Sequence, residues 1–525
     1  MKIKLLIISL IVLLTTTVSA SSIEVSGEVS GLWSVDTVLV MSDLTIADGQ
    51  SLEISPGTRV IFWGHFKINV QGKITALGLV GDSIVFTVRD TANFHNQTTE
   101  RGGWFGIRFT QTPVTNDTSV FSYCRFEYGK AFGDSIQQNG GAIFAQDFSK
   151  LKISNCLFFN NYSFVSGGAV YLWNSDAVII NNSFIDNYAG NTGTVYGYGG
   201  GLCAMHCSPA ILDNYFSSNS STGIGGGLSM DDADPVFYNN IFDGNYSALG
   251  GGLGILRSSP STTFSNLLIV NNESLFFGGG LCCIRSFPVF SNLTVADNLS
   301  SYGGGFYCND SAVPSMYNSI IYNNDGLGTS VYIWDVRSAP NFYYCDIEGG
   351  AEGFEGSGGH EGYHGVYQNN IDSPPGFYGT GSYPYQLTES SPCIDNGTPD
   401  ANFLNLPEED LSGAPRIWNN RLDIGTYEFN GTTGIPETRK TGLDITLAPN
   451  PVMDNLEIRF GEVTPEILHF VIFNQEGKEI TRFEVPAGTK QYTFQNPANS
   501  DTAKSGVYFL KCSSNETIVL KFIKL

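Results

Sequence analysis

Seven polar or charged residues recur at a nearly constant spacing through the middle of this sequence, and they are the first candidates for chemistry. They are Asp147, Asn174, His206, Asp232, Arg257, Arg285 and Asp310. If a repeating fold stacks them, carboxylates and guanidinium groups become close neighbours, as in sites that bind calcium and acidic sugars. A catalytic site of this kind would consist of Asp231, Asp232, Asp234, Arg257 and Arg285, with calcium as the ion that its carboxylates could hold.

The same column has a purely structural interpretation. Asp232 with Arg257, and Arg285 with Asp310, are opposite charges on neighbouring repeats, and exposed pairs of this kind contribute at most ~1 kcal/mol each. Basic residues are also scarce for an enzyme that must hold an anionic polyuronate, since the segment 140–324 contains only Lys150, Lys152, Arg257 and Arg285. We therefore favour a charge ladder over an active site, and the question of enzymatic activity stays open.

Aromatic residues offer a different chemistry, the stacking of rings on sugars. Phe144, Tyr171 and Tyr307 are expected in one outward-facing column, and Trp173 follows on the same strand. Exposed rings bind sugar faces, and long loops carry function more often than regular repeats do. The predicted ligand-binding residues are therefore Tyr171, Trp173, Tyr196, Tyr198 and His206, the two later tyrosines lying in the longest repeat. The alternative is that an outward tyrosine simply suits a strand.

One motif resembles a zinc-protease signature by letters alone. His360-Glu361-Gly362-Tyr363-His364 has the HExxH spacing, which works when a helix places both imidazoles on one face. Glycines surround the motif on both sides, so no helix is expected there. The sequence predicts no metal ligand and no cofactor, calcium at the acidic residues being the one exception considered.

A repeated phrase must position all these residues. Seven copies open with a glycine cluster followed by an aliphatic or aromatic residue, the first being Gly141-Ala142-Ile143 and the last Gly304-Gly305-Phe306. Each copy also carries an asparagine, and most copies are 26 residues long: Asn155, Asn182, Asn214, Asn240, Asn266, Asn292 and Asn318. A second file follows five positions later: Asn160, Asn187, Asn219, Asn245, Asn271, Asp297 and Asn323. A fixed period of this length indicates stacked supersecondary units.

Within a copy the apolar residues alternate, which predicts three short strands separated by turns. Strands that pair with their equivalents one turn later form an all-β right-handed parallel β-helix, whose coils lie ~4.8 Å apart. Equivalent residues then stack, and the asparagines are expected in an inward file, where each amide can donate and accept. Cys283 and Cys308 would be neighbours in an inward column, as a thiol stack or a disulfide.

Composition restricts the partners. The net charge of −23 should repel nucleic acid and anionic lipid, while cations or neutral glycans remain suitable ligands. At the amino terminus, Lys2 and Lys4, an apolar run and Ser19-Ala20 form a predicted signal peptide. No later segment is apolar for long enough to be a transmembrane span. An exported protein is expected.

The segments before and after the repeats resemble known proteins. Ile84-Val85-Phe86-Thr87, the stretch around Gly103-Trp104-Phe105-Gly106 and the later Tyr344-Cys345-Asp346-Ile347 look like coils of the pectate-lyase-like β-helix superfamily. The middle copies resemble the GGA and FxxN repeats of the polymorphic membrane protein adhesins, as in Gly167-Gly168-Ala169-Val170 with Phe184-Ile185-Asp186-Asn187. These resemblances imply a surface-displayed β-helix, with an adhesin-like role that the missing autotransporter barrel leaves open.

The chain end resembles the type IX secretion sorting domain. The resemblance rests on Pro449-Asn450-Pro451, a glycine turn at Gly477, Gly506-Val507-Tyr508 and the basic, apolar final strand. It implies a small β-sandwich that engages the type IX machinery and is released or anchored at the outer membrane. The expected domains are a signal peptide (1–20), amino-terminal coils (21–139), repeat coils (140–350), a cap (351–429), a linker (430–441) and the sorting domain (442–525).

The most economical interpretation is a secreted or surface-anchored β-helix that binds an extracellular polysaccharide or surface glycan without catalysis. A polysaccharide lyase or glycoside hydrolase is the first alternative, and a structural surface protein is the second.

Overall fold

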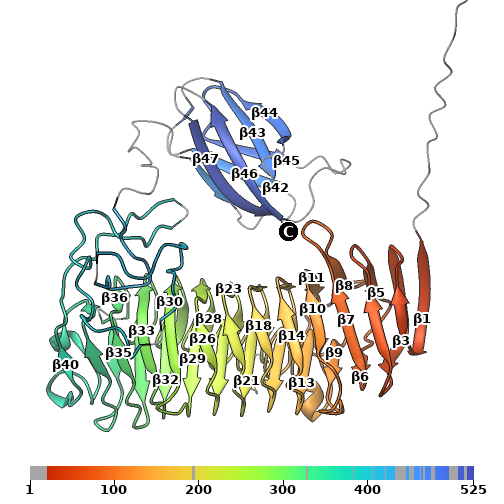
Figure 1. Cartoon of the computed structure of the whole chain (residues 1–525), viewed down its shortest axis with the longest axis horizontal. Helices are drawn as coiled ribbons and strands as arrows, with labels where there is room; N and C mark the ends of the chain where they lie inside the picture. Colours follow the sequence, from red (N-terminus) through yellow and green to blue (C-terminus); the bar gives the residue numbers. More distant parts are fainter. Residues whose placement is uncertain are drawn as a thin grey trace, which may run out of the picture.

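The computed structural model describes residues 21–525 except 192–195, 327–328, 382, 405, 420, 432–444, 449–454, 461–462, 465–466, 475–478, 496–505, 514–516 and 525. The predicted signal peptide, the Pro449-Asn450-Pro451 motif, the turn at Gly477 and most of the predicted linker lie outside these residues. The described part is almost entirely β, and its main body is a long parallel β-helix (Figure 1).

Three parallel sheets run the length of this body. Sheet 1 contains β6(Ile68–Val70), β9(Ile107–Phe109), β13(Ile143–Gln146), β17(Val170–Trp173), β21(Leu202–Met205), β25(Leu228–Asp231), β29(Leu253–Leu256), β32(Leu281–Ile284), β34(Phe306–Asn309) and β37(Val331–Ile333). Sheet 2 contains β2(Gly31–Trp33), β4(Ser51–Ile54), β7(Lys73–Leu77), β10(Ser119–Ser122), β14(Leu151–Ser154), β18(Val178–Ile180), β22(Ala210–Leu212), β26(Val236–Tyr238), β35(Ser315–Tyr317), β38(Asn341–Tyr343) and β40(Tyr367–Gln368). Sheet 3 contains β1(Ser22–Glu28), β5(Arg59–Phe62), β8(Ile84–Val88), β11(Cys124–Glu127), β15(Leu157–Phe159), β19(Ser183–Ile185), β23(Tyr215–Ser217), β27(Ile241–Asp243), β36(Ile320–Tyr322) and β39(Asp346–Ile347).

A few elements complete the coils. Three long strands serve two sheets each: β3(Thr37–Ile46), β30(Thr263–Val270) and β33(Val289–Ala296). A fourth, short parallel sheet contains β12(Lys130–Ala131), β16(Tyr162–Ser163), β20(Tyr188–Ala189), β24(Ser220–Ser221), β28(Tyr246–Leu249) and β31(Glu273–Phe277). Helix in the described residues is limited to single 3₁₀ turns, η1(Ser135–Gln138), η2(Ala351–Gly353) and η3(His360–Gly362).

Stacking of like residues fills the interior. The rings of Phe126, Phe158, Phe184, Phe216 and Phe242 form a continuous column with centroids 4.7–4.9 Å apart. The glycine clusters are required where coils approach each other: Gly167 has φ +63°, and a Cβ on Gly168 would lie 2.0 Å from the carbonyl oxygen of Gly200. No side chain fits at that distance, so the repeated glycines allow the coils to stack at strand spacing.

The asparagines stack, but not in the file predicted from their spacing. Parallel pairing places Asn155 beside Asn181, one residue before the inward Asn182. Four of the predicted inward asparagines therefore occupy an outer, left-handed turn position: Asn155, Asn266, Asn292 and Asn318. Of the seven predicted asparagines, Asn182, Asn214 and Asn240 lie in the inner file at this corner, which Leu267 and Leu293 continue. The error arises because asparagine suits both the inner position and the adjacent left-handed turn.

The second file is shifted in the same way and is longer. Its inner members are Asn161, Asn187, Asn219, Asn245, Asn272, Asn298 and Asn324. The Oδ1 atom of Asn219 accepts hydrogen bonds from the backbone N–H and the amide of Asn187, at 3.1 and 2.8 Å. Its own amide donates to Asn245 at 3.0 Å and to the carbonyl of Phe184 at 2.8 Å. Each asparagine thus satisfies the bent backbone of its neighbours.

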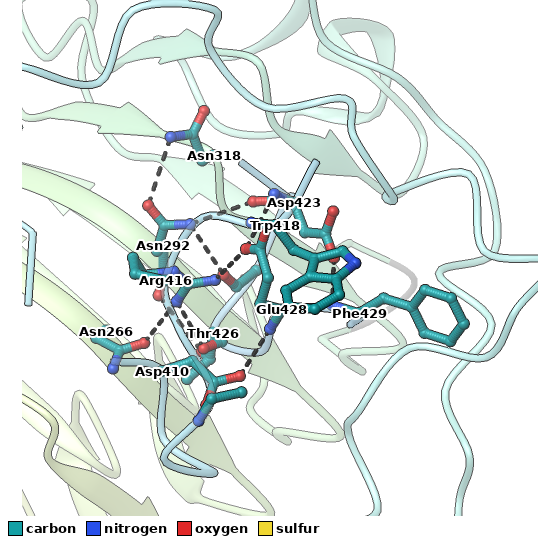
Figure 2. Close-up of polar contacts among 12 residues, drawn as sticks. Asn266, Asn292, Asn318, Asp410, Arg416, Trp418, Asp423, Thr426, Glu428 and Phe429 are labelled. Atoms are coloured by element: carbon teal, nitrogen blue, oxygen red, sulfur yellow. Dashed lines mark hydrogen bonds and ion pairs between the residues drawn. The ribbon is translucent and has the colours of Figure 1, made fainter. Parts of the chain in front are cut away.

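The segment after β40, residues 372–430, forms what we call the arm, and it packs along the flank of the later coils. Tyr427 packs with Leu268, Val270 and Ala296, while Ile424 packs with Ile320. Figure 2 shows the polar contacts beneath the arm, where the outer-turn residues Asn266, Asn292 and Asn318 are buried. The expected cap therefore covers the side of the helix as well as following its last coil.

Arg416 is the central polar residue of the arm. It is 3% exposed, and its guanidinium donates to Asn266 Oδ1 and Glu428 Oε2, both at 3.0 Å (Figure 2). Asn292 donates to the carbonyls of Asp423 and Gly425 at 3.2 and 3.1 Å. Three of the four outer-turn asparagines, Asn266, Asn292 and Asn318, therefore hold the arm.

The buried carboxylate of Asp346 joins the coils to the arm, and the buried carboxylate of Asp423 holds the arm together. Asp346 accepts from the Ser373 backbone at 3.1 Å and from the Cys393 thiol at 3.2 Å. Asp423 accepts from the backbone N–H groups of Asp395 and Phe429. Burial raises the pKa of each carboxyl to about 6, although these hydrogen bonds partly oppose the shift.

The last part of the chain is a separate β-sandwich. One antiparallel sheet contains β41(Ile445–Ala448), β42(Asn455–Phe460) and β45(Gln491–Gln495). The other contains β43(Leu468–Asn474), β44(Glu479–Val485), β46(Gly506–Ser513) and β47(Thr517–Lys524). A shared apolar core, including Ile458, Phe470 and Leu510, lies between them.

The asparagine file predicts a large loss of stability on truncation. Asn219→Ala should lower the free energy of unfolding by about 3 kcal/mol or more, because it leaves several buried polar groups without partners. Asn181→Gly is the matched control, since Asn181 is exposed with φ +54° and glycine keeps that conformation. We expect chemical denaturation to show less than about 1 kcal/mol for the control. Equal losses in the two variants would contradict a special role for the inner file.

The buried aspartates predict a stability that rises as the pH falls. Their folded-state pKa of about 6 lies above that of an unfolded aspartate, so the folded form gains protons first. The melting temperature should therefore increase between pH 8 and pH 5, and the gain should disappear as the pH rises through 6. Asp346→Asn should flatten this profile by roughly 1–1.5 kcal/mol over this range, because pH 5 lies only about one unit below the folded-state pKa. An unchanged slope in that variant, with exposed Asp48→Asn as control, would refute the assignment.

Candidate functional site

The predicted column of polar residues exists. Register pairing in sheet 1 stacks the residue that follows each strand, and we call this file the turn column. All seven members have left-handed backbones with φ between +49° and +55°: Asp147, Asn174, His206, Asp232, Arg257, Arg285 and Asp310. Such conformations are uncommon for arginine and histidine, and here they turn each polar side chain away from the core.

The ion pairs differ from those predicted. Arg285 does pair with Asp310, with Nη2 and Oδ2 2.6 Å apart. Arg257, however, pairs with Asp231 instead of Asp232, whose Oδ2 lies 2.8 Å from His206 Nδ1. The exchange follows from position, because Asp231 ends a strand while Asp232 belongs to the turn column, and the two side chains therefore leave the backbone in different directions.

Asp231 has the most unusual surroundings of the acidic candidates. Its side chain is 12% exposed, and its Oδ1 atom has no hydrogen-bond partner among the described residues. Burial raises the pKa of this carboxyl, against the opposing effects of Arg257 and His206. A carboxyl with a raised pKa beside a guanidinium is a feature of acid–base sites, although a buried ion pair also produces it.

Asp234 has a structural role. Its Oδ1 atom accepts hydrogen bonds from the backbone of Ser259 at 2.9 Å and from the Thr262 hydroxyl. Burial raises its pKa, but these hydrogen bonds outweigh burial, so the pKa lies below the usual value. Across the part of the chain that the structure describes, no three histidine, cysteine or acidic side chains converge as a metal site would require. Among the described residues, Asp231, Asp232 and Asp234 are therefore not gathered into one such group.

Four of the predicted residues, Tyr171, Trp173, Tyr198 and His206, form one cluster that supports the exposed Trp173. Trp173 is 38% exposed, and its ring packs on His206 at 4.9 Å and on Tyr171 at 6.3 Å between centroids. Tyr171 itself is only 4% exposed, so the expectation that it offers a sugar-binding face is wrong. Tyr198 from the long loop packs with Tyr171, while Tyr196 is 74% exposed. Tyr171 and His206 therefore hold Trp173 in place.

A second aromatic cluster was not predicted. Phe277 is its centre, with the rings of Tyr302, Tyr307, Tyr332 and Trp334 between 4.7 and 5.7 Å away. Trp334 and Tyr302 are 47% and 38% exposed. Glycine pairs mark the other copies, whereas the coil of Trp334 has Thr329 and Ser330 at the equivalent positions. The available signal was Tyr332-Ile333-Trp334, which repeats the pattern of Tyr171-Leu172-Trp173.

The remaining motifs carry no site. His360 begins the 3₁₀ turn η3, which ends at Gly362, so no α-helix places His360 and His364 on one face. Cys283 and Cys308 are register neighbours, and all ten cysteines are buried free thiols.

Comparison with known families agrees with this architecture. Residues 114–288 and 168–371 match the family described as a right handed beta helix region. Residues 446–524 match the secretion system C-terminal sorting domain. The search of curated proteins gave no match. No helix in the described part of the chain has the length and apolar character needed to cross a bilayer.

These matches confirm the fold class and the resemblance at the chain end. The sorting domain directs export through the type IX secretion system, after which the protein is attached to the surface or released. The chain is a secreted right-handed β-helix protein with a C-terminal secretion-system sorting domain.

Proposed function

We propose that this secreted protein binds an extracellular polysaccharide or surface glycan through the face of sheet 1, without cleaving it. The observation that supports binding is the exposed Trp173, supported on two sides by Tyr171 and His206. A ring fixed in this way can stack on a sugar without losing much conformational freedom on binding. The adjacent turn column supplies polar groups for sugar hydroxyls.

The charges of this face favour binding over catalysis. Asp231, Asp232 and Asp310 are each paired with a basic side chain. Glycoside hydrolysis requires one carboxylic acid as proton donor and a second carboxylate as base or nucleophile across the scissile bond. The Asp231 and Asp310 carboxylates are already compensated by Arg257 and Arg285, so they serve this purpose poorly, and the two arginines leave no excess positive charge for an acidic ligand.

One observation supports polysaccharide cleavage as a second candidate. Asp231 combines a raised pKa with an unpartnered oxygen, and Arg257 could neutralise an acidic sugar beside it. In that case Asp231, Asp232 and Arg257 would act together, with Arg285 one coil further on. A purely structural surface role would show neither binding nor cleavage.

Binding to a panel of soluble polysaccharides tests the proposal. We expect at least one neutral polysaccharide to bind the full chain in isothermal titration calorimetry, and Trp173→Ala to weaken it tenfold or more through loss of stacking. Trp63→Ala is the control, because Trp63 is comparably exposed at 42% but follows β5 of sheet 3. Equal effects of both substitutions would reject the site.

The same panel separates binding from cleavage. We expect no new reducing ends and no unsaturated uronates after long incubation with the wild-type protein. Turnover that Asp231→Asn or Asp232→Ala abolishes would replace the binding proposal with the enzymatic one.

A further inference from the structure

Two equivalent tyrosine–tryptophan pairs, which we call stations, occur on the face of sheet 1. In the first, Tyr171 and Trp173 have ring centroids 6.3 Å apart and an interplanar angle of 44°. In the second, Tyr332 and Trp334 have the same separation of 6.3 Å and an angle of 45°. In each station the tryptophan is exposed and the tyrosine lies more deeply beneath it. The same small unit is therefore built twice.

The two stations lie in one register file. Six successive pairings lead from β17 through β21, β25, β29, β32 and β34 to β37, and Trp334 follows Ile333 as Asn309 follows Cys308. Six coil spacings correspond to about 29 Å along the helix axis. The rings thus present their faces at two ends of one straight line.

The surface between the stations consists of two parallel files of side chains. The strand-end file holds Met205, Asp231, Leu256, Ile284 and Asn309, of which three are half-buried apolar side chains. The turn column beside it carries exposed polar groups from His206 to Arg285. An extended sugar chain has the same division, because its pyranose faces are apolar and its edges carry hydroxyls. The apolar file and the polar file therefore complement the faces and edges of a sugar chain that lies along the helix axis.

Further aromatic contacts keep the second station rigid. Phe277 contacts Trp334 at 5.2 Å in an edge-on arrangement and also contacts Tyr332. Asp335 fixes the following turn, since it accepts hydrogen bonds from the backbone N–H groups of Asp310 and Arg337 at 2.8 and 3.0 Å. The first station is supported in a comparable way by His206. Both tryptophans are therefore pre-arranged for a ligand.

We propose that one extended, neutral polysaccharide chain occupies both stations at once and lies parallel to the helix axis, with β-linked glucans as the probe. The inference rests on the proposed function and adds the length, direction and charge class of the ligand. Neutrality follows from the turn column, where Arg257 and Arg285 already have acidic partners and leave no excess positive charge. A polysaccharide that reaches both stations gains affinity from the second contact, because that contact forms within the same complex.

Chain-length dependence tests the inference. Using β-1,4- and β-1,3-glucan oligosaccharides of two to eight sugars, we expect the octasaccharide to bind the full chain at least tenfold more tightly than the trisaccharide. We expect one octasaccharide per protein but two trisaccharides, because a short chain fills a single station. Calorimetry reports both quantities.

Substitution of the second station gives the sharper test. Trp334→Ala should reduce octasaccharide affinity to the level of the trisaccharide, while trisaccharide affinity falls only about twofold and its stoichiometry falls to one. Trp334→Phe should restore most of the effect, and Trp418→Ala, an exposed tryptophan of the arm, should change nothing.

Each failure has a distinct meaning. If octasaccharide and trisaccharide bind equally and both require Trp173, a single station binds glycan and the spanning ligand is refuted, while the proposed function stands. If polysaccharides bind but neither glucan series does, the assigned ligand class is wrong. Absence of binding to every oligosaccharide and polysaccharide refutes both proposals.

Discussion

The constraint that governs this protein is the in-register pairing of each strand with its equivalent one coil away. Every residue has a near copy of its own position above and below it, at strand spacing. Side chains that stack well with themselves are therefore favoured inside, as in the phenylalanine column and the seven-membered asparagine file. Positions that face outward are free of this requirement and can vary from coil to coil. Function has to be sought in that variation.

The turn column shows how the same constraint builds a surface. Each of its residues has a left-handed backbone at the end of a sheet 1 strand, so polar side chains of different chemistry are presented in one straight row. Neighbouring coils then pair opposite charges, and the row is nearly neutral. Two exposed tryptophans in the adjoining file give this neutral row the capacity to stack on sugars. A flat, extended wall of this kind suits a long ligand better than a small one.

The repeat spacing alone predicted the fold class and the turn column, because stacking follows directly from a constant period. It failed by one residue for the asparagines, since asparagine is equally suited to the inner file and to the left-handed turn beside it. The exchange of Asp232 for Asp231 as the partner of Arg257 has a similar origin. Adjacent residues at the end of a strand leave it in different directions, and spacing does not show which one a neighbour reaches.

Contacts between distant segments could not be predicted from the repeat. Asn266 and Asn292, in the left-handed turn beside the inner file, hold the arm through Arg416, Asp423 and Gly425. Tyr171 is buried because the loop containing Tyr198 packs against it. Trp334 was missed because its coil lacks the glycine pair that marks the other copies, although its register with Trp173 is unbroken.

A crystal structure of the secreted protein with a bound β-glucan octasaccharide would test the central claim most directly. We expect one continuous ligand parallel to the helix axis, with a sugar stacked on Trp173 and another on Trp334. A ligand lying across the coils, or bound away from sheet 1, would contradict the claim, as would a structure in which the two tryptophans do not share one register file.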